Sequence, residues 1–204
     1  LHFIPQEEGS LAVDVAYRNA FRGDVRSARQ PAVAGSDLPL LLDREEEHAS
    51  PAKRRARREK VIGSYSDILP NGAYDAARLR EEMPERCHVR DWDLVYSSRR
   101  HGISMNTFFH KVVGKRDTVL LVKDDRGFVF GGFVPSEWKN SSKEFYGTGE
   151  CFVFQLYPTL TKYTWKGDNS MFLMTDMTGL VMGGGGKAAI WLDAEFNNGG
   201  SRPC

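Results

Sequence analysis

The sequence has few cysteines, no long apolar run and almost no net charge. Its three cysteines, Cys87, Cys151 and Cys204, are odd in number and show no C-x-x-C spacing, which argues against a disulfide framework or a zinc site. No apolar run approaches the ~18 residues that a membrane span needs, and residues 1–5 lack the basic and apolar regions of a signal peptide. A net charge of +1 gives no overall field to attract nucleic acid or a membrane surface. We therefore expect a cytoplasmic protein with reduced thiols.

The composition is that of an ordinary globular chain, but residues 1–60 differ from the rest. Hydrophobic residues make up 41% of the 204 positions, enough for one packed domain plus a tail. Residues 11–21 fit one amphipathic helix, and an acidic patch at 45–47 precedes a basic run from Lys53 to Lys60. Charge blocks separated by prolines are typical of a linker or a solvated helix. We divide the chain into a charged, partly helical N-terminal extension over 1–60 and a globular domain over 61–204.

The basic run from Lys53 to Lys60 also fits a nuclear-localisation or nucleic-acid-binding segment. The neighbouring acidic patch weakens this interpretation, and no aromatic residues are interleaved with the basic ones to stack on bases. We therefore expect no nucleic-acid partner.

Two segments of the domain carry helix signals. Residues 74–83 have Asp75 near their start and Pro84 just beyond their end, as at many helix boundaries. Ser104 is placed to cap a second helix, because its side-chain oxygen can accept an unpaired N–H of the first turn. This second helix repeats apolar residues at the spacing of one buried face, namely Met105, Phe108, Phe109, Val112 and Val113. His110 lies off that stripe and is expected to face solvent.

Short strands separated by turns make up most of the domain. The best hairpin joins 118–123 to 128–134 through a turn at 124–127. Because 128–134 is apolar on both faces, we expect a central strand covered by a second layer. Further strands are expected at 92–97, 151–157, 161–165, 171–174, 180–182 and, last, 189–193, followed by a turn at Asn198-Gly199. This pattern predicts an α+β, mainly β fold, a two-sheet antiparallel β-sandwich flanked by short helices, after an irregular N-terminal extension.

Two glycine-rich stretches invite nucleotide-binding interpretations that fail. Around the run 183–186, the positions where a P-loop needs glycine and serine or threonine hold Val181 and Ala188. The stretch 147–149 fails the dinucleotide fingerprint, whose sixth position is Phe152 here. We interpret the glycine run as a tight, close-approach connection between strands, because glycine has no Cβ.

Residues that could carry chemistry are few. A tight turn delivers Glu150 to the mouth of a core strand, and Glu150, His101 and Cys151 are weak candidates for a hydrolytic or peroxide-directed site if they share one cleft. The sequence has no G-x-S-x-G elbow and no His, Cys and carboxylate cluster with metal spacing. The structural alternatives are that Glu150 accepts backbone N–H bonds from neighbouring turns and that Cys151 is an inert buried thiol.

Taken together, these stretches resemble the TLDc domain family. The matching segments occur in order at 91–98, 101–104, 120–124, 129–131, 146–154, 163–165, 169, 182–185, 190–193 and 200–201. They cover roughly residues 61–204, and the ordered set is specific although no single segment is. The predicted helix at 74–83 fits the leading helix of the family.

The resemblance implies a β-sandwich, protection against oxidative stress, and binding to the vacuolar-type proton ATPase, whose assembly some members regulate. It implies no enzymatic activity and no cofactor. The partner surface would use the glycine-rich turns and Glu150, namely Gly102, Gly131, Gly147, Gly149, Glu150, Gly183, Gly184 and Gly185. A partner of this kind would recruit the protein to organelle membranes. The family continues past Cys204 with closing strands, so we expect a C-terminally truncated domain.

The sequence leaves three functional hypotheses open. The first is a non-catalytic interaction domain, as the resemblance implies. The second is a hydrolase or peroxide-directed enzyme that uses Glu150 with His101 or Cys151. The third is a structural component of a large assembly, for example a cytoskeletal one, with residues 1–60 as an extended arm.

Overall fold

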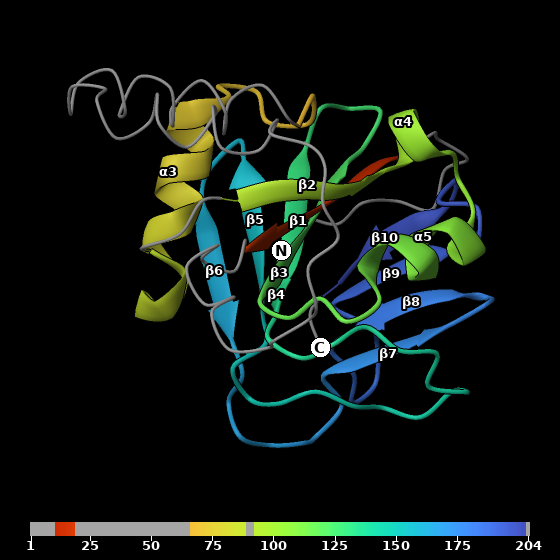
Figure 1. Ribbon diagram of the computed structural model, residues 1–204. Helices are drawn as coiled ribbons and strands as arrows, with labels where there is room; N and C mark the ends of the chain where they lie inside the picture. Colours follow the sequence, from red (N-terminus) through yellow and green to blue (C-terminus); the bar gives the residue numbers. More distant parts are fainter. Residues whose placement is uncertain (1–10, 19–65, 89–91, 203–204) are drawn as a thin grey trace, which may run out of the picture.

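Two antiparallel sheets make up most of the protein (Figure 1). The computed structural model describes residues 11–18, 66–88 and 92–202. The larger sheet has the strand order β2-β1-β3-β4-β5-β6, and the smaller has the order β10-β9-β8-β7. The larger sheet consists of β1 Ala12–Arg18, β2 Trp92–Ser97, β3 Thr118–Lys123, β4 Val129–Val134, β5 Phe152–Tyr157 and β6 Thr161–Thr164. The smaller consists of β7 Leu173–Asp176, β8 Gly179–Met182, β9 Ile190–Asp193 and β10 Gly199–Ser201. The mainly β, two-sheet prediction is confirmed.

Apolar side chains cover both faces of the larger sheet. One cluster joins the two sheets and contains Leu120 of β3 and Leu180 of β8. A second cluster lies on the other face of the larger sheet and contains Phe133 of β4 and Phe154 of β5. Successive strand residues point to opposite faces, so β4, which is buried along its whole length, contributes to both clusters. Its predicted central position under a second layer is confirmed.

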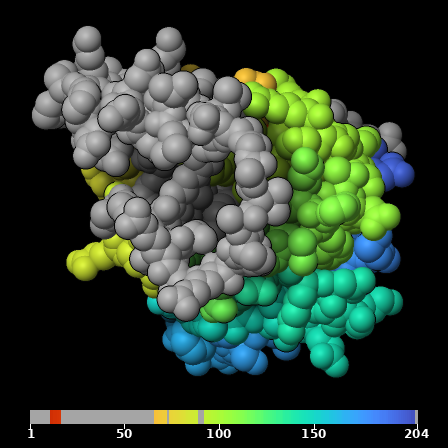
Figure 2. All heavy atoms as spheres, in the orientation of Figure 1, coloured from red at the N-terminus to blue at the C-terminus, as the bar shows by residue number. Residues whose placement is uncertain are grey.

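Short helices flank the sheets, as predicted. They are α3 (Ala73–Glu81), the 3₁₀ turn η1 (Glu85–Cys87), α4 (Ser98–His101) and α5 (Met105–Val112). Side chains of α3 and η1 pack against the outer face of the larger sheet, whereas α5 contributes to the cluster between the sheets. The region of α4 and α5 forms the yellow-green surface at the upper right of Figure 2.

The buried face of α5 is close to the predicted one. Met105, Phe108 and Val112 are buried, but Val113 is 65% exposed. The helix ends at Val112, and Val113 leaves the helical path with φ −55° and ψ 135°. Ser104 occupies the capping position, but its side chain makes no capping hydrogen bond. The backbone carbonyl of Ser104 instead accepts the N–H of Phe108, which completes the first turn of the helix.

Residues 12–18 form a strand, so the helix predicted over 11–21 is wrong. Leu11, Val13 and Val15 alternate with Ala12 and Asp14, and all three are buried. In so short a stretch, this period-two pattern also fits a helix. Pairing with β2 and β3, both distant in sequence, decides between them. Residues 19–21, the acidic patch and the basic run lie outside the described residues.

Most other strand predictions are confirmed. β3 and β4 form the expected hairpin, whose turn contains Gly127 at φ 87°. β5 pairs with β6, and Phe152, Phe154 and Leu156 are buried on one face. β7 begins at Leu173 rather than 171, because the two preceding residues belong to a loop.

The sequence did not predict β10. This strand pairs with β9, whereas we expected a turn at Asn198-Gly199 after a last strand at 189–193. A strand of two glycines and a serine carries no alternating apolar pattern, so only its pairing with β9 identifies it.

Candidate functional site

The glycine-rich stretch before β5 approaches a loop formed by residues 165–172. A Cβ at Gly149 would lie 2.4 Å from Trp165 Cε3. A Cβ at Gly147 would lie 3.1 Å from Phe172 Cβ, and Gly147 also has φ 109°, where side chains are strained. Glycine at these two positions lets the loop pack directly on the backbone.

The second glycine run, between β8 and β9, approaches the same loop. The N–H of Gly183 donates a 2.8 Å hydrogen bond to the carbonyl of Phe172. A Cβ at Gly184 would lie 2.8 Å from Met171 Cβ. These contacts match the close backbone approach expected for this run. They bring together glycines that lie more than thirty residues apart in the sequence.

Asn169 holds the loop in this position. Its side-chain Nδ2 donates to the Gly184 carbonyl at 3.1 Å, and its Oδ1 accepts the N–H of Met171 at 2.9 Å. Its backbone carbonyl accepts the indole N–H of Trp165 at 2.7 Å. A Cβ at Gly185 would lie 3.0 Å from Asn169 Nδ2, so this glycine leaves room for the amide. Asn169 therefore connects the glycine run to both ends of the loop.

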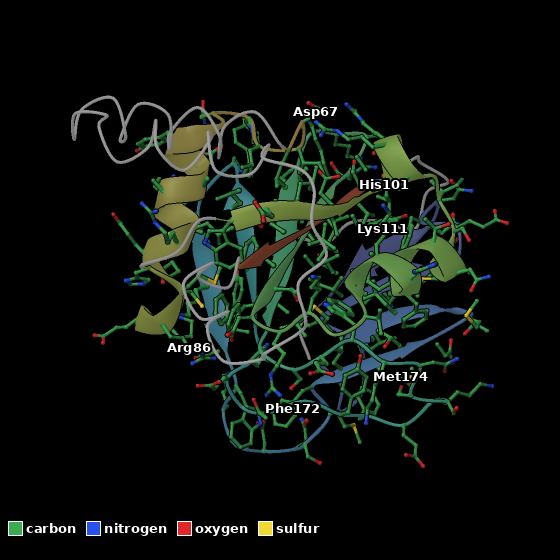
Figure 3. All side chains as sticks on the ribbon, in the orientation of Figure 1. Asp67, Arg86, His101, Lys111, Phe172 and Met174 are labelled. Carbon is green, nitrogen blue, oxygen red and sulfur yellow. The ribbon has the colours of Figure 1, made fainter. Side chains whose placement is uncertain are left out.

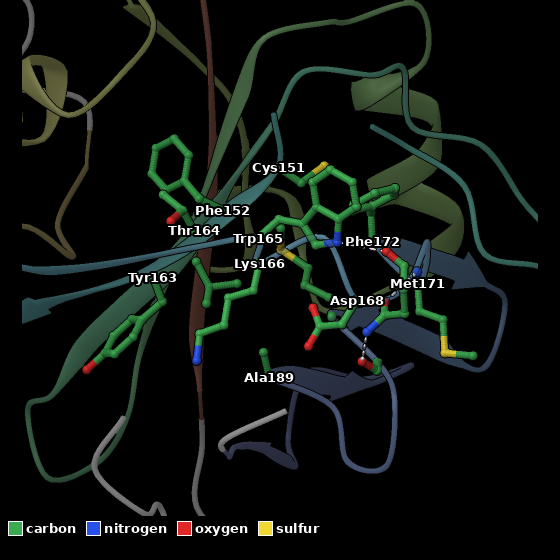
Figure 4. Close-up of a pocket in the computed structure, with 15 residues that line it drawn as sticks. Cys151, Phe152, Tyr163, Thr164, Trp165, Lys166, Asp168, Met171, Phe172 and Ala189 are labelled. Carbon is green, nitrogen blue, oxygen red and sulfur yellow. Dashed lines mark hydrogen bonds between the residues drawn. The ribbon is translucent and has the colours of Figure 1, made fainter. Parts of the chain in front are cut away.

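A pocket of about 250 Å³ lies beside this loop (Figure 4). Its lining includes Cys151, Tyr163, Trp165, Met171, Phe172 and Met182. Trp165 and Met171 are 46% and 41% exposed, so both remain accessible to a partner. The pocket is smaller than the usual range for drug-sized ligands, and it suits one bulky apolar side chain. We call these lining residues and the glycines around them the glycine-fitted pocket.

Glu150 lies next to the pocket, but its carboxylate binds Arg86 of η1. Arg86 donates from Nη1 to Oε1 at 3.0 Å and from Nη2 to Oε2 at 2.7 Å, a bidentate pair. Arg86 also donates from Nε and Nη2 to Asp117 Oδ1, at 3.1 and 3.0 Å. These hydrogen bonds raise the pKa of Arg86, and those to Glu150 have the larger effect. A side chain thus supplies the hydrogen bonds that we expected from backbone N–H groups.

Cys151 is buried in the pocket wall. The side chain lies close to Gly147, where a Cβ would be 3.4 Å from Sγ. Burial raises the pKa of the Cys151 thiol above its ordinary value. A thiol of raised pKa stays protonated near neutral pH and is a poor nucleophile.

His101 is remote from Glu150 and its partner. His101 lies on α4, and its Nδ1 accepts the backbone N–H of Ser97 at 3.0 Å. Burial, followed by the nearby charges of Lys111 and Arg100, lowers the pKa of His101. Figure 3 shows His101 and Arg86 on well-separated parts of the molecule. Glu150, His101 and Cys151 therefore do not share the one cleft that the catalytic hypothesis needs.

Two of the predicted glycines lie away from the pocket. Gly131 is in the middle of β4, where a Cβ would lie 1.9 Å from the carbonyl oxygen of Leu120. It therefore serves strand packing. Gly102 joins α4 to α5 with φ 86° and ψ 168°, a conformation adopted almost only by glycine, and open space surrounds it.

Sequence reasoning missed Arg86 and misplaced part of the loop. Arg86 precedes Glu150 by 64 residues, and no spacing rule connects them. Met171 and Phe172 look like strand residues because they are consecutive and apolar. The only sequence signals for these features were Pro84 before η1 and the turn residues around Asn169.

Residues 11–18, 66–88 and 92–202 contain neither a candidate metal site nor a candidate membrane-spanning helix. In these ranges no group of three or more His, Cys, Asp or Glu side chains could hold a metal ion. No helix there is long and apolar enough to cross a membrane. Cys151 is a free thiol.

The two-sheet sandwich and its short helices agree with the fold that the resemblance to the TLDc domain implies. Residues 64–204 match the TLDc domain family, and the chain belongs to that family. Over 187 residues it is 37% identical to "Oxidation resistance protein 1" of Rattus norvegicus, covering 89% of this chain and 22% of the relative. Over 129 residues it is 41% identical to the Homo sapiens protein of the same name, covering 62% of this chain and 15% of the relative.

A second group of relatives carries a different name. The chain is 35% identical over 146 residues to "Nuclear receptor coactivator 7" of Gallus gallus, covering 71% of this chain and 16% of the relative. The chain therefore spans about a fifth of the length of the curated relatives it matches, or less. The similarity concerns one domain of much longer proteins.

Proposed function

We propose that this chain is a non-catalytic interaction domain that contributes to protection against oxidative stress by binding the vacuolar-type proton ATPase. Membership of the TLDc family and the similarity to oxidation resistance proteins support the oxidative-stress part. The family resemblance in the sequence motivates the choice of partner. The domain would act in the cytoplasm and reach organelle membranes through this partner.

The observation that carries the proposal is the glycine-fitted pocket. Trp165 and Met171 are large, half-exposed side chains at its margin, and Asn169 fixes the loop that bears them. Aromatic residues and methionine are enriched in protein interfaces, where a few well-placed side chains dominate the binding energy. A pre-formed pocket also lowers the entropy lost when a partner side chain is ordered on binding. This arrangement suits the capture of a protruding apolar side chain.

The positions of the candidate chemical groups also favour binding over catalysis. An acid or base must reach the reacting atoms, and a nucleophile needs an activating neighbour. Here the Glu150 carboxylate is engaged by Arg86, the Cys151 thiol has a raised pKa, and His101 lies elsewhere. The arrangement therefore favours binding by Glu150 and Arg86 at the margin of the pocket.

The test is a binding measurement with purified vacuolar-type proton ATPase and the chain immobilised. We expect Trp165→Ala to weaken binding by at least about tenfold, as for a central aromatic contact in an interface. Glu150→Gln should weaken it less, because exposed charge pairs contribute little. The control is Lys187→Gln, which changes one exposed charge without altering the pocket lining.

Unchanged binding by a folded Trp165→Ala variant would remove the pocket from the proposal. Absence of binding by the unmodified chain would remove the proton ATPase as partner. Circular dichroism and a thermal unfolding curve for each variant separate these results from misfolding.

A further inference from the structure

The segment from Ser98 to Arg116 is strongly basic in a chain that is almost neutral. It contains two lysines, three arginines and two histidines, and no aspartate or glutamate. The whole chain carries only +1. The positive charge of this segment is therefore a local feature of the surface.

The fold gathers these charges on α4 and α5. Arg99 and Arg100 are exposed on α4, and Lys111 is exposed near the end of α5. Arg100 and Lys111 both act on the pKa of His101, which places the two charges close to one ring. Figure 3 shows His101 and Lys111 next to each other on the two helices.

Two exposed aliphatic residues stand at the ends of α5. Ile103, just before the helix, is 47% exposed, and Val113, just after it, is 65% exposed. The eight residues of α5, which lie between them, span about 12 Å, because a helix rises about 1.5 Å per residue. An extended peptide advances about 3.3 Å per residue, so residues four apart in a peptide span a similar distance. We call Arg99, Arg100, Ile103, Lys111 and Val113 the basic face.

We propose that the basic face docks an extended acidic segment of a partner protein that carries two aliphatic residues four positions apart. Glutamates or aspartates of this segment would pair with the arginines, whose planar guanidinium matches a carboxylate in bidentate geometry. The aliphatic residues would cover Ile103 and Val113. This surface is separate from the glycine-fitted pocket, and the inference does not depend on the proposed function.

The make-up of the basic face favours a peptide over other anionic partners. Its two exposed aliphatic residues are single and well separated, whereas a membrane-binding helix presents a continuous apolar face. The exposed residues of 98–116 include no Phe, Tyr or Trp side chain, the larger rings on which nucleic-acid bases stack best. One exposed acidic residue, Glu195, lies near α5. It belongs to the turn whose Phe196 packs against Phe108 of that helix.

The test is fluorescence anisotropy with the full chain and two labelled acidic peptides of about twelve residues. One peptide is polyglutamate with two leucines four positions apart, and the other has serines in their place. We expect the leucine peptide to bind, and its dissociation constant to rise on the order of tenfold in Arg99→Gln/Arg100→Gln, because two charge pairs are lost. Val113→Ser should weaken the leucine peptide severalfold and leave the serine peptide unchanged.

A matched control is Lys143→Gln/Lys187→Gln, which lowers the net charge equally at exposed positions elsewhere. It should bind the leucine peptide as the unmodified chain does. No binding by this peptide, equal weakening in both double variants, or no effect of Val113→Ser would each overturn the inference. Anionic vesicles containing phosphatidylserine provide the last arm. Binding to these vesicles, without binding to the leucine peptide, would assign the face to a membrane and also overturn it.

Discussion

The glycine-fitted pocket and the basic face are surfaces of opposite construction. In the pocket, Trp165 and Met171 lie against backbone that only glycine can provide, and hydrogen bonds of Asn169 hold their loop in place. On the basic face, Arg99 and Arg100 are exposed, and the two glycines of this segment, Gly102 and Gly114, have no atom near the place of their missing Cβ. The shape of the pocket depends on the space that its glycines leave, whereas the basic face depends on the charge of its side chains.

This difference predicts which changes each surface tolerates. An added methyl group should disturb the pocket, because side chains of the loop already occupy the place of the missing Cβ at Gly149 and Gly184. Changes of exposed side chains on the basic face should leave the fold unaffected and alter only binding. Gly102 is sensitive for another reason, since its φ of 86° and ψ of 168° strain any other residue.

The largest expected effect is that of Gly149→Ala. Its new Cβ would overlap the Trp165 ring and force this half-exposed side chain to shift, so we expect a loss of unfolding free energy in the lower half of the range of about 1–3 kcal/mol that overpacking costs in closed cores. The φ of Gly149 lies outside the left-handed region, so the effect isolates the steric contact. Urea unfolding followed by circular dichroism measures it.

A double-mutant cycle with Trp165→Ala tests the cause. Removing the indole should recover most of the loss from Gly149→Ala, because the two residues are in contact. The control pair is Gly102→Ala with the same Trp165→Ala change, where the two losses should simply add. Additive losses in the Gly149 cycle would show that contact with the Trp165 ring is not the reason why glycine is needed at position 149.

A smaller effect is expected for Arg86→Gln, at the margin of the pocket. This change removes the hydrogen bonds to Glu150 and Asp117, and we expect a loss of about 1 kcal/mol because the Arg86 side chain is 38% exposed. Glu150→Gln, which breaks only the more exposed pair, should lose less. Urea unfolding at low and high salt checks this prediction, since salt should reduce both losses. Losses that do not change with salt would assign the effect to packing instead.

Arg99→Gln/Arg100→Gln should change the unfolding free energy by no more than about 0.5 kcal/mol, as for exposed residues away from packed features. The same thermal or urea unfolding experiment checks it. A loss comparable to that of Gly149→Ala would break the distinction between the two surfaces, because the arginines would then have a structural role.

Much of the fold could be predicted because local patterns decide it. The β3–β4 hairpin was readable from two apolar runs around a turn, and α5 from its repeated apolar residues. β1 and β10 were not readable, for different reasons. β1 is short enough to fit two periods, and β10 has no pattern at all, so distant pairing determines both strands.

The site was predictable in its parts and not in its assembly. The glycines at 147, 149, 183, 184 and 185 stood out because glycine marks close backbone approach. Their convergence on one loop depends on how β5 and β8 lie in different sheets, which no local pattern contains. The pairing of Glu150 with Arg86 was hidden for the same reason.

The smallest expected effect is the pH dependence contributed by His101 beside the basic face. Its pKa is lowered from the ordinary 6.5 by burial and by Lys111 and Arg100, so the folded protein binds its proton more weakly than the unfolded chain. Stability from this residue is therefore fully present above the unfolded-state pKa of about 6.5 and is lost as the pH falls through the lowered pKa of the folded protein. Protonation of Nδ1 would also remove the acceptor for the Ser97 N–H.

His101→Asn supplies the test, because its side-chain oxygen can still accept a hydrogen bond while its charge does not change with pH. We expect unfolding free energies measured between neutral and mildly acidic pH to fall more steeply for the unmodified chain than for the variant. The difference between the two curves isolates His101 from the other histidines. Parallel curves would mean that His101 titrates alike in the folded and unfolded chain. The lysine and arginine of the basic face would then be too well screened by solvent to act on the ring, and the basic face would be weaker than its sequence suggests.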